Sequence, residues 1–287
     1  MADGIPILAA VSLRESTVML GEPVLLDCRI TNHSESVVAV ALGELGLAQW
    51  VTVELLDPAG KRVPPTPDYR PKSRGGLVFA RCNLKAGETH SEALVVSHRV
   101  SPPRPGKYRL SVTARVPYMV GRESVDFNEK EQLSTLVADW SLDLNVTKAD
   151  AERLHQLADR LAARITGRRV ADAVGKELKL PRKATVIQAL FSMPEKHALP
   201  VWRSVVNDPD LHYPESEPVV DELLRIGSPA AANLLACMWD NKTGNGKWAL
   251  FNLWWTGGPG IKKHIDGIFA ARGEKMPEAK GPIVPMD

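Results

Sequence analysis

Apolar and polar residues alternate one by one through much of the first half of the chain. Three runs show the pattern most clearly: 22–30 (EPVLLDCRI), 106–116 (GKYRLSVTARV) and 139–146 (DWSLDLNV). A period of two places successive side chains on opposite faces of a β-strand. In the second run, one face carries Tyr108, Leu110, Val112, Ala114 and Val116. These runs predict strands with one buried face and one polar face.

Turn-forming residues separate the predicted strands. They are DPAGK at 57–61, KAGE at 85–88 and RPGK at 104–107. Glycine, proline and aspartate in these positions favour tight turns. Many short strands without a helical period between them predict an antiparallel sandwich of two sheets.

The period changes near residue 147. Apolar residues in 145–167 (NVTKADAERLHQLADRLAARITG) recur at helical spacing, which predicts an amphipathic helix from about residue 149. Three similar segments begin at residues 186, 219 and 249, and each reads as a helix, a break at proline or glycine, and a second helix. Pro194, Pro229 and Pro259 lie where each second helix begins, a position that tolerates a missing N–H. Repeats of this length are typical of stacked helical hairpins.

Both halves resemble known families. EPVLLDCRITN, VTVELLDPAGKRV and PGKYRLSV resemble bacterial immunoglobulin-like β-sandwiches, a group that includes intracellular proteinase-inhibitor-like domains, and Tyr108 resembles a tyrosine corner. RIGSPAAANLLACM and SMPEKHALPVW resemble HEAT repeats. The second resemblance implies a surface that binds another protein.

The expected fold is therefore all-β followed by all-α. We expect an antiparallel immunoglobulin-like β-sandwich over 1–147, a HEAT-like helical hairpin repeat domain over 148–276, and a C-terminal tail over 277–287.

Composition limits the kinds of partner that this protein is expected to bind. A net charge of +2 over 287 residues gives no strong field for nucleic acid, and the basic residues of 160–183 read as a solvated helix face. No window is apolar for long enough to span a membrane. The N-terminal residues lack the pattern of a signal peptide, which predicts a cytoplasmic protein, or a periplasmic or secreted one if a signal has been removed.

The three cysteines are too few for a disulfide scaffold. Cys28 and Cys82 do not occupy the strand positions that are paired in the immunoglobulin-like family, so we expect a buried, reduced pair, with a disulfide as the alternative.

Tryptophans concentrate in KWALFNLWWTGGPGIKK, residues 247–263. Helical geometry places Trp248 and Trp255 on one face and Trp254 well apart. We expect Trp248, Phe251 and Trp255 to form a buried ridge, and Trp254 and Trp239 to be the more exposed rings. These rings are either core or a binding platform.

Further candidate sites lie in loops. The long stretches 63–76 and 117–133 suggest binding loops, with Tyr69, Arg70 and Phe127 as candidate contacts. The acidic loop 208–217 offers Asp208, Asp210 and His212 as weak metal ligands. The sequence has no nucleophile elbow, phosphate loop, zinc-binding helix or paired C-x-x-C, and predicts no cofactor.

These patterns predict a non-catalytic, bacterial-type binding or scaffolding protein that engages another protein. The alternative is a protease inhibitor that acts through a sandwich loop. A third hypothesis is a hydrolase that uses the acidic loop. The oligomeric state stays open.

Overall fold

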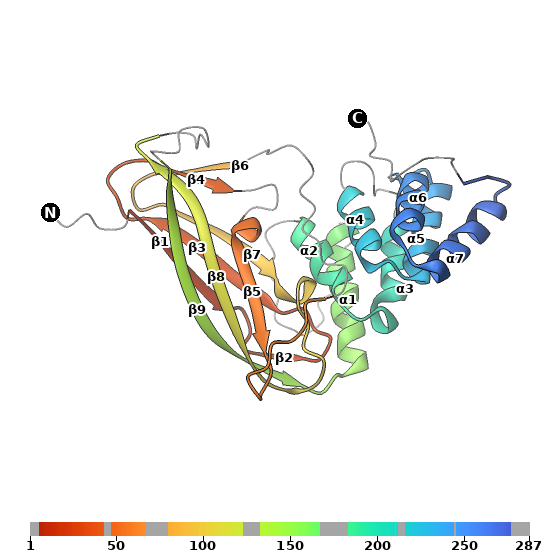
Figure 1. The fold of residues 1–287 in the computed structure, drawn as a ribbon, viewed down its shortest axis with the longest axis horizontal. Coiled ribbons are helices and arrows are strands. Elements are labelled where there is room, and N and C mark those ends of the chain that lie inside the picture. Colours follow the sequence, from red (N-terminus) through yellow and green to blue (C-terminus); the bar gives the residue numbers. More distant parts are fainter. Residues whose placement is uncertain are drawn as a thin grey trace. The chain divides into compact units, whose positions relative to one another are not determined.

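The computed structural model describes residues 6–42, 47–66, 80–122, 133–166, 183–209, 211, 216–243 and 245–276. Two compact units divide the chain, residues 1–150 and residues 151–287. The first is rich in strands, and the described part of the second is built from helices (Figure 1).

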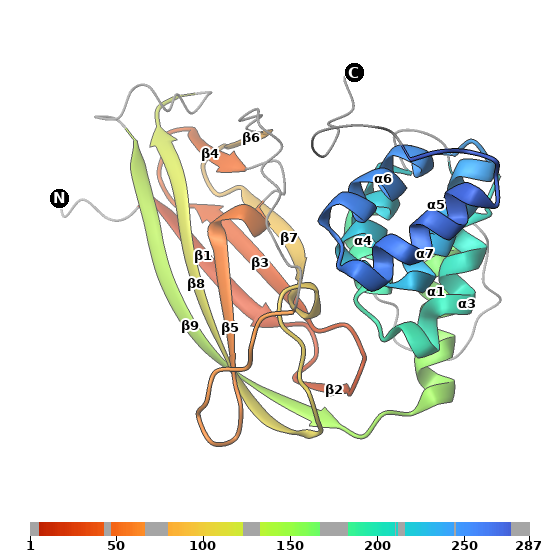
Figure 2. The ribbon, with the colours of Figure 1, turned by 45° about the vertical axis from the view of Figure 1, so that its right-hand side comes forward.

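The first unit contains two β-sheets. Its described elements are β1 (Ile7–Leu13), β2 (Thr17–Met19), β3 (Leu25–Asn32), β4 (Val38–Leu42), η1 (Leu47–Trp50), β5 (Val51–Leu56), β6 (Ala80–Leu84), β7 (Thr89–Val95), η2 (Val96–His98), β8 (Gly106–Val120) and β9 (Ser134–Thr147). The smaller sheet has the order β1-β3-β7, and the larger has the order β2-β9-β8-β4-β6, with β5 also paired to β8. β8 is long enough to pair with β5 near its start and β4 near its end (Figure 2).

The predicted alternation is confirmed. The inward positions of β3 and β8 are buried, including Leu26, Ile30, Leu110 and Val112. Both sheets contribute side chains to one apolar core. Trp140 and Leu142 of β9 are only partly buried against this core, because they lie toward its margin. Burial of these faces is the main favourable free energy of the first unit.

Two details of the first unit concern turns and pairing. Gly60 and Gly87, in the predicted turns, have φ values of 76° and 75°, which favour glycine. The Tyr108 hydroxyl donates to the Arg104 carbonyl at 2.8 Å, the bond expected of a tyrosine corner. The expected purely antiparallel pairing is wrong in one place, because β2 runs parallel to β9. A three-residue strand is too short to show its pairing partner in its pattern.

The described part of the second unit forms seven helices. They are α1 (Ala151–Thr166), α2 (Lys183–Phe191), α3 (Glu195–Val206), α4 (Glu217–Ile226), α5 (Pro229–Asp240), α6 (Gly246–Thr256) and α7 (Pro259–Ala270). Successive helices pair as α2 with α3, α4 with α5 and α6 with α7, as the three repeated segments predict. Helices α2, α4 and α6 form one row and α3, α5 and α7 the other, while α1 packs on α2 and α3. None of the described helices is long and apolar enough to cross a bilayer.

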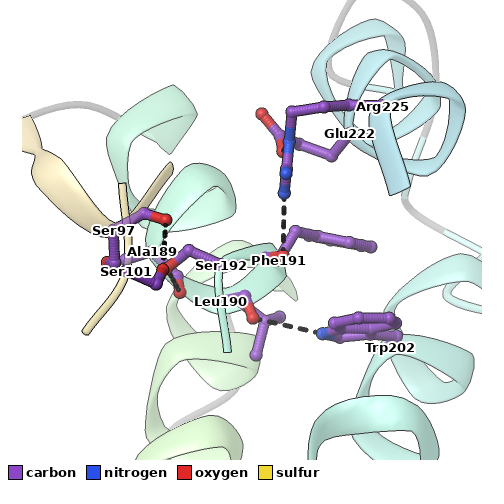
Figure 3. A network of polar contacts seen from close by, with 9 residues as sticks. All are labelled: Ser97, Ser101, Ala189, Leu190, Phe191, Ser192, Trp202, Glu222 and Arg225. Carbon is purple, nitrogen blue, oxygen red and sulfur yellow. Dashed lines mark hydrogen bonds and ion pairs between the residues drawn. The ribbon is translucent and has the colours of Figure 1, made fainter. Parts of the chain in front are cut away.

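Side chains close the end of α2 inside the second unit (Figure 3). The last carbonyls of a helix have no partner within the helix. Trp202 of α3 donates its indole N–H to the Leu190 carbonyl at 3.2 Å and stacks on Phe191. Arg225 of α4 donates to the Phe191 carbonyl at 3.0 Å. The end of α2 is therefore joined to its own hairpin and to the next one.

The Arg225 guanidinium also contacts a buried carboxylate. Its Nε lies 2.8 Å from Oε2 of Glu222, one helical turn earlier, and the two side chains are only 12% and 7% exposed. A buried ion pair stabilises a fold little by itself, but removing one partner leaves the other charge in a poor solvent. Arg225 therefore holds two buried acceptors at once.

We predict that Arg225→Met lowers the free energy of unfolding of the second unit by about 3 kcal/mol, because Glu222 loses its cation and Phe191 its donor. Urea titration followed by helical circular dichroism measures the change. Arg203→Met, at an exposed position of α3, is the matched control. Equal midpoints for the two variants would contradict the role given to Arg225.

Candidate functional site

Helix α6 presents tryptophans on its outer side. Its buried side consists of Ala249, Leu250, Phe251 and Leu253. Trp248 is 40% exposed, and it is one of the few exposed large apolar side chains among the described residues. Trp255 is half-buried and contacts Phe251 with ring centroids 6.5 Å apart. The prediction that Trp248 belongs to a buried ridge is therefore wrong.

Helical phase explains this error. Residues 248, 252 and 255 share one face of α6, as expected from 100° per residue. The phase shows which side chains lie together, but the neighbouring helices decide which face is covered. Here α4, α5 and α7 pack on α6, and the face with Trp248 stays open. We call Trp248, Asn252 and Trp255 the outer face of α6.

Asn252 adds a polar group to this face. Its Oδ1 is buried and has no hydrogen-bond partner among the described residues. A buried acceptor without a donor costs free energy. The outer face of α6 is thus apolar at both ends with an unpaired acceptor in the middle.

Trp254 is less exposed than its sequence predicts. Its indole N–H donates to Oδ1 of Asp266 at 2.9 Å, and the Lys262 ammonium lies 4.9 Å from the ring centroid. Both partners come from α7, and the ring also contacts Trp255 at 6.1 Å. A cation over an indole face is attracted by the ring quadrupole. Trp254 therefore joins α6 to α7 and is half-buried.

Trp239 is the other ring that the sequence predicts to be exposed, and neighbouring side chains cover it as well. It packs on Phe269 of α7 at 5.1 Å, with the Lys247 ammonium 5.1 Å and the Arg272 guanidinium 5.2 Å from its ring centroid. Arg272 is paired with Asp240 at 2.5 Å, and this bond holds the pKa of that carboxyl below its usual value. Trp239 thus lies half-buried at the junction of α5, α6 and α7.

Close backbone packing fixes the position of α6. A Cβ atom on Gly246 would lie 2.6 Å from the Leu235 carbonyl oxygen and 2.6 Å from the Trp239 nitrogen of α5. Only glycine permits this approach without a shift of backbone. The outer face of α6 is therefore carried by a rigidly seated helix.

Several other predicted site residues lie outside the described residues. They are Tyr69, Arg70 and Phe127 of the two long loops, together with Asp210 and His212 of the acidic loop. Asp208 is described and is buried. Within the described ranges, no group of histidine, cysteine, aspartate and glutamate side chains could hold a metal ion. The inhibitor and hydrolase hypotheses depend on these loops and stay predictions.

Comparisons with known proteins give no family. No protein-family model matches the chain, and no curated protein matches its sequence. The CARDB domain of a Pyrococcus furiosus protein, solved with di-metal ions, is similar at 14% identity and a TM-score of 0.21, over 49% of this chain and 87% of that one. A PapD-like domain of human CEP192 is similar at 13% identity and a TM-score of 0.25, over the same shares.

A third similar structure is a much larger enzyme. A beta-glucosidase from Listeria innocua, in complex with isofagomine, matches at 16% identity and a TM-score of 0.21. The match covers 50% of this chain but only 16% of that enzyme. Scores this low support no inference about the activity of this chain.

The burial of the tryptophans leads to a stability prediction. We expect Trp254→Ala to lower the free energy of unfolding of the second unit by roughly 2 kcal/mol, because α6 and α7 lose a packed ring and the hydrogen bond to Asp266. Trp248→Ala removes a more exposed ring and is expected to cost no more than about 1 kcal/mol. Urea titration of the two variants tests this order, and the reverse order would show that Trp248 is the structural residue.

Proposed function

We propose that this chain is a non-catalytic binding protein whose outer α6 face engages a segment of another protein. In this proposal the second unit is a HEAT-like stack of hairpins, and the first is an immunoglobulin-like sandwich. The observation that carries the proposal is the 40% exposure of Trp248 beside a half-buried Trp255 on a firmly seated helix.

The chemistry of this face favours a protein partner. Tryptophan is enriched among the residues that dominate protein–protein binding energy, because it brings a large apolar area at a low entropic cost. An open Trp248 beside a half-buried Trp255 suits an apolar or aromatic side chain of the partner. Preorganisation supports affinity, because a rigid helix loses little freedom on binding.

The arrangement of positive charge makes nucleic acid a less favourable partner than protein. Lys247 of α6 is engaged with Glu274 at 3.0 Å, and Lys262 of α7 lies over the Trp254 ring. Phosphate binding requires several free cations in a groove or stripe. Of the basic stretch 160–183, only Arg160, Arg164 and Lys183 are described, and they belong to α1 and α2 rather than to α6.

Substitution of Trp248 tests the proposal. The full chain would be used to capture partners from the cells that produce it, and a captured protein would then be purified and titrated by calorimetry. We expect Trp248→Ala to weaken binding about 30-fold, corresponding to a loss of about 2 kcal/mol at a central tryptophan.

The matched control is Leu8→Ala, which removes an exposed apolar side chain, 59% accessible, from β1 of the other unit. This variant should bind the partner as tightly as the parent protein. Unchanged affinity in Trp248→Ala, with the fold intact by circular dichroism, would rule out the outer face of α6 as the contact surface.

A further inference from the structure

The first unit has an edge strand, β1, that pairs on one side only. Strand β1 pairs with β3 along its whole length, and none of the described strands pairs with its other side. β9 of the other sheet lies near β1 but forms no hydrogen-bonded ladder with it. A strand at the edge of a sheet presents a row of N–H and C=O groups that can pair with a further strand.

Backbone hydrogen bonds show which residues of β1 present this edge. The Arg14 N–H donates to the Leu25 carbonyl at 3.0 Å, and the Pro6 carbonyl accepts the His33 N–H at 2.8 Å. In an antiparallel ladder, residues in hydrogen-bonded pairs alternate with residues whose N–H and C=O groups point away from the partner strand. The even-numbered residues of β1 are therefore bonded to β3, and the odd-numbered residues direct these groups to the open edge.

The open part of this edge runs from Ala9 to Leu13. The side chains of Ala9, Val11 and Leu13 pack against the apolar core and are half-buried, whereas Ile7 is fully buried. Ala10, on the opposite face of the strand, is exposed. The core thus holds β1 in an extended form while its outer face remains exposed.

β1 lacks the features that protect other edges from pairing. Charged side chains, proline and short length are common protections of edge strands. The described edge strands β5, β7 and β9 contain Glu54, Glu92 and Asp139, and β2 has only three residues. Strand β1 has seven residues, ILAAVSL, with no charge and no proline. It is therefore suited to accept another uncharged strand.

We propose that β1 pairs antiparallel with β1 of a second copy of this chain, across a two-fold axis at Ala10. The pairing joins two three-stranded sheets into one continuous sheet. Addition of a strand to a sheet edge gains main-chain hydrogen bonds, and a second β1 is already held as a strand. In this register Ala9 and the partner's Val11 exchange two hydrogen bonds, and the symmetry repeats them on the other side of the axis.

The side chains of β1 fit this register. A two-fold axis at Ala10 places odd-numbered residues opposite odd-numbered ones, so core-facing side chains stay on the core side of both copies. Opposed residues that are not hydrogen-bonded to each other approach to about 4.5 Å between Cα atoms. At the axis this close approach involves only the methyl groups of Ala10 and the partner's Ala10. Leu8, which is 59% exposed, lies opposite the partner's Ser12.

The distribution of charge also permits pairing of identical strands. Like charges directly opposite each other destabilise a ladder, and β1 has none. Arg14, just beyond its end, is paired with Asp27. Arg29 of β3 lies beside Ala10, so three strand spacings, about 14 Å, separate it from the partner's Arg29. This separation exceeds the screening length at physiological salt, and a net charge of +2 adds little repulsion.

The test measures self-association of the full chain by analytical ultracentrifugation from about 1 to 200 µM. One strand from each copy gives a smaller interface than a standard stable complex, so we expect a dissociation constant on the order of 10 µM. Ala10→Lys should raise this constant at least roughly tenfold, because two lysines meet at the axis. Ala59→Lys is the matched control: it places the same charge at an exposed alanine of a turn in the same unit, and should leave the dimer unchanged.

A charge swap tests the two-fold axis itself. Ala10→Glu should also dissociate the dimer, whereas an equimolar mixture of Ala10→Lys and Ala10→Glu should associate more tightly than either variant alone, because opposite charges then meet. Circular dichroism of each variant checks that the fold is intact.

Three results would overturn the proposal. The first is a chain that stays monomeric at 200 µM, and the second is a dimer that Ala10→Lys leaves unchanged. The third is a separate protein that binds the monomeric chain and is lost with Ala10→Lys, which would assign the edge of β1 to that protein. None of these results bears on partner binding by α6, which lies in the other unit.

Discussion

The second unit depends on how the C-terminal end of α2 is closed. A buried helix end leaves carbonyl oxygens that must find donors, since an unsatisfied acceptor in an apolar core costs about as much as several buried methylene groups contribute. Trp202 and Arg225 supply these donors from two different helices. Helix α2 is thereby bonded to both α3 and α4. The seating of α6 against α4 and α5 extends the same arrangement.

This closure also explains why two polar residues persist in an apolar environment. Glu222 and Arg225 lie one turn apart on α4, and replacing both by apolar side chains would leave the Phe191 carbonyl without its donor. The ion pair therefore contributes more by holding the Arg225 donor at the end of α2 than by its own attraction. This agrees with the small net contribution of buried ion pairs to stability.

The sequence predicted the strands and helices better than it predicted which side chains are exposed. Alternation located the buried positions of β3 and β8, and Pro229 and Pro259 each begin a helix where the breaks were expected. The exposure of Trp248 was missed because periodicity assigns residues to faces without saying which face a neighbour covers. Trp254 was misjudged for a related reason: Lys262 and Asp266 cover its ring only once α7 is packed beside α6.

The pair of His90 and Glu92 on β7, whose Nε2 and Oε1 atoms lie 2.9 Å apart, was missed although a signal was present. His90 and Glu92 occupy inward positions of β7, where the alternation calls for apolar residues, and such an exception indicates a paired or functional group.

The position of His90 and Glu92 explains how a charged pair is tolerated beside an apolar core. β6 and β7 are in contact where the two sheets meet, and both are terminal strands of their sheets among those described. Groups at such a margin keep part of their hydration, so a carboxylate and an imidazolium cost less there than in the middle of the core. A charged pair of this kind is therefore favoured at the margin of the two sheets and disfavoured deeper in the core, where burial also raises the pKa of the Cys28 thiol.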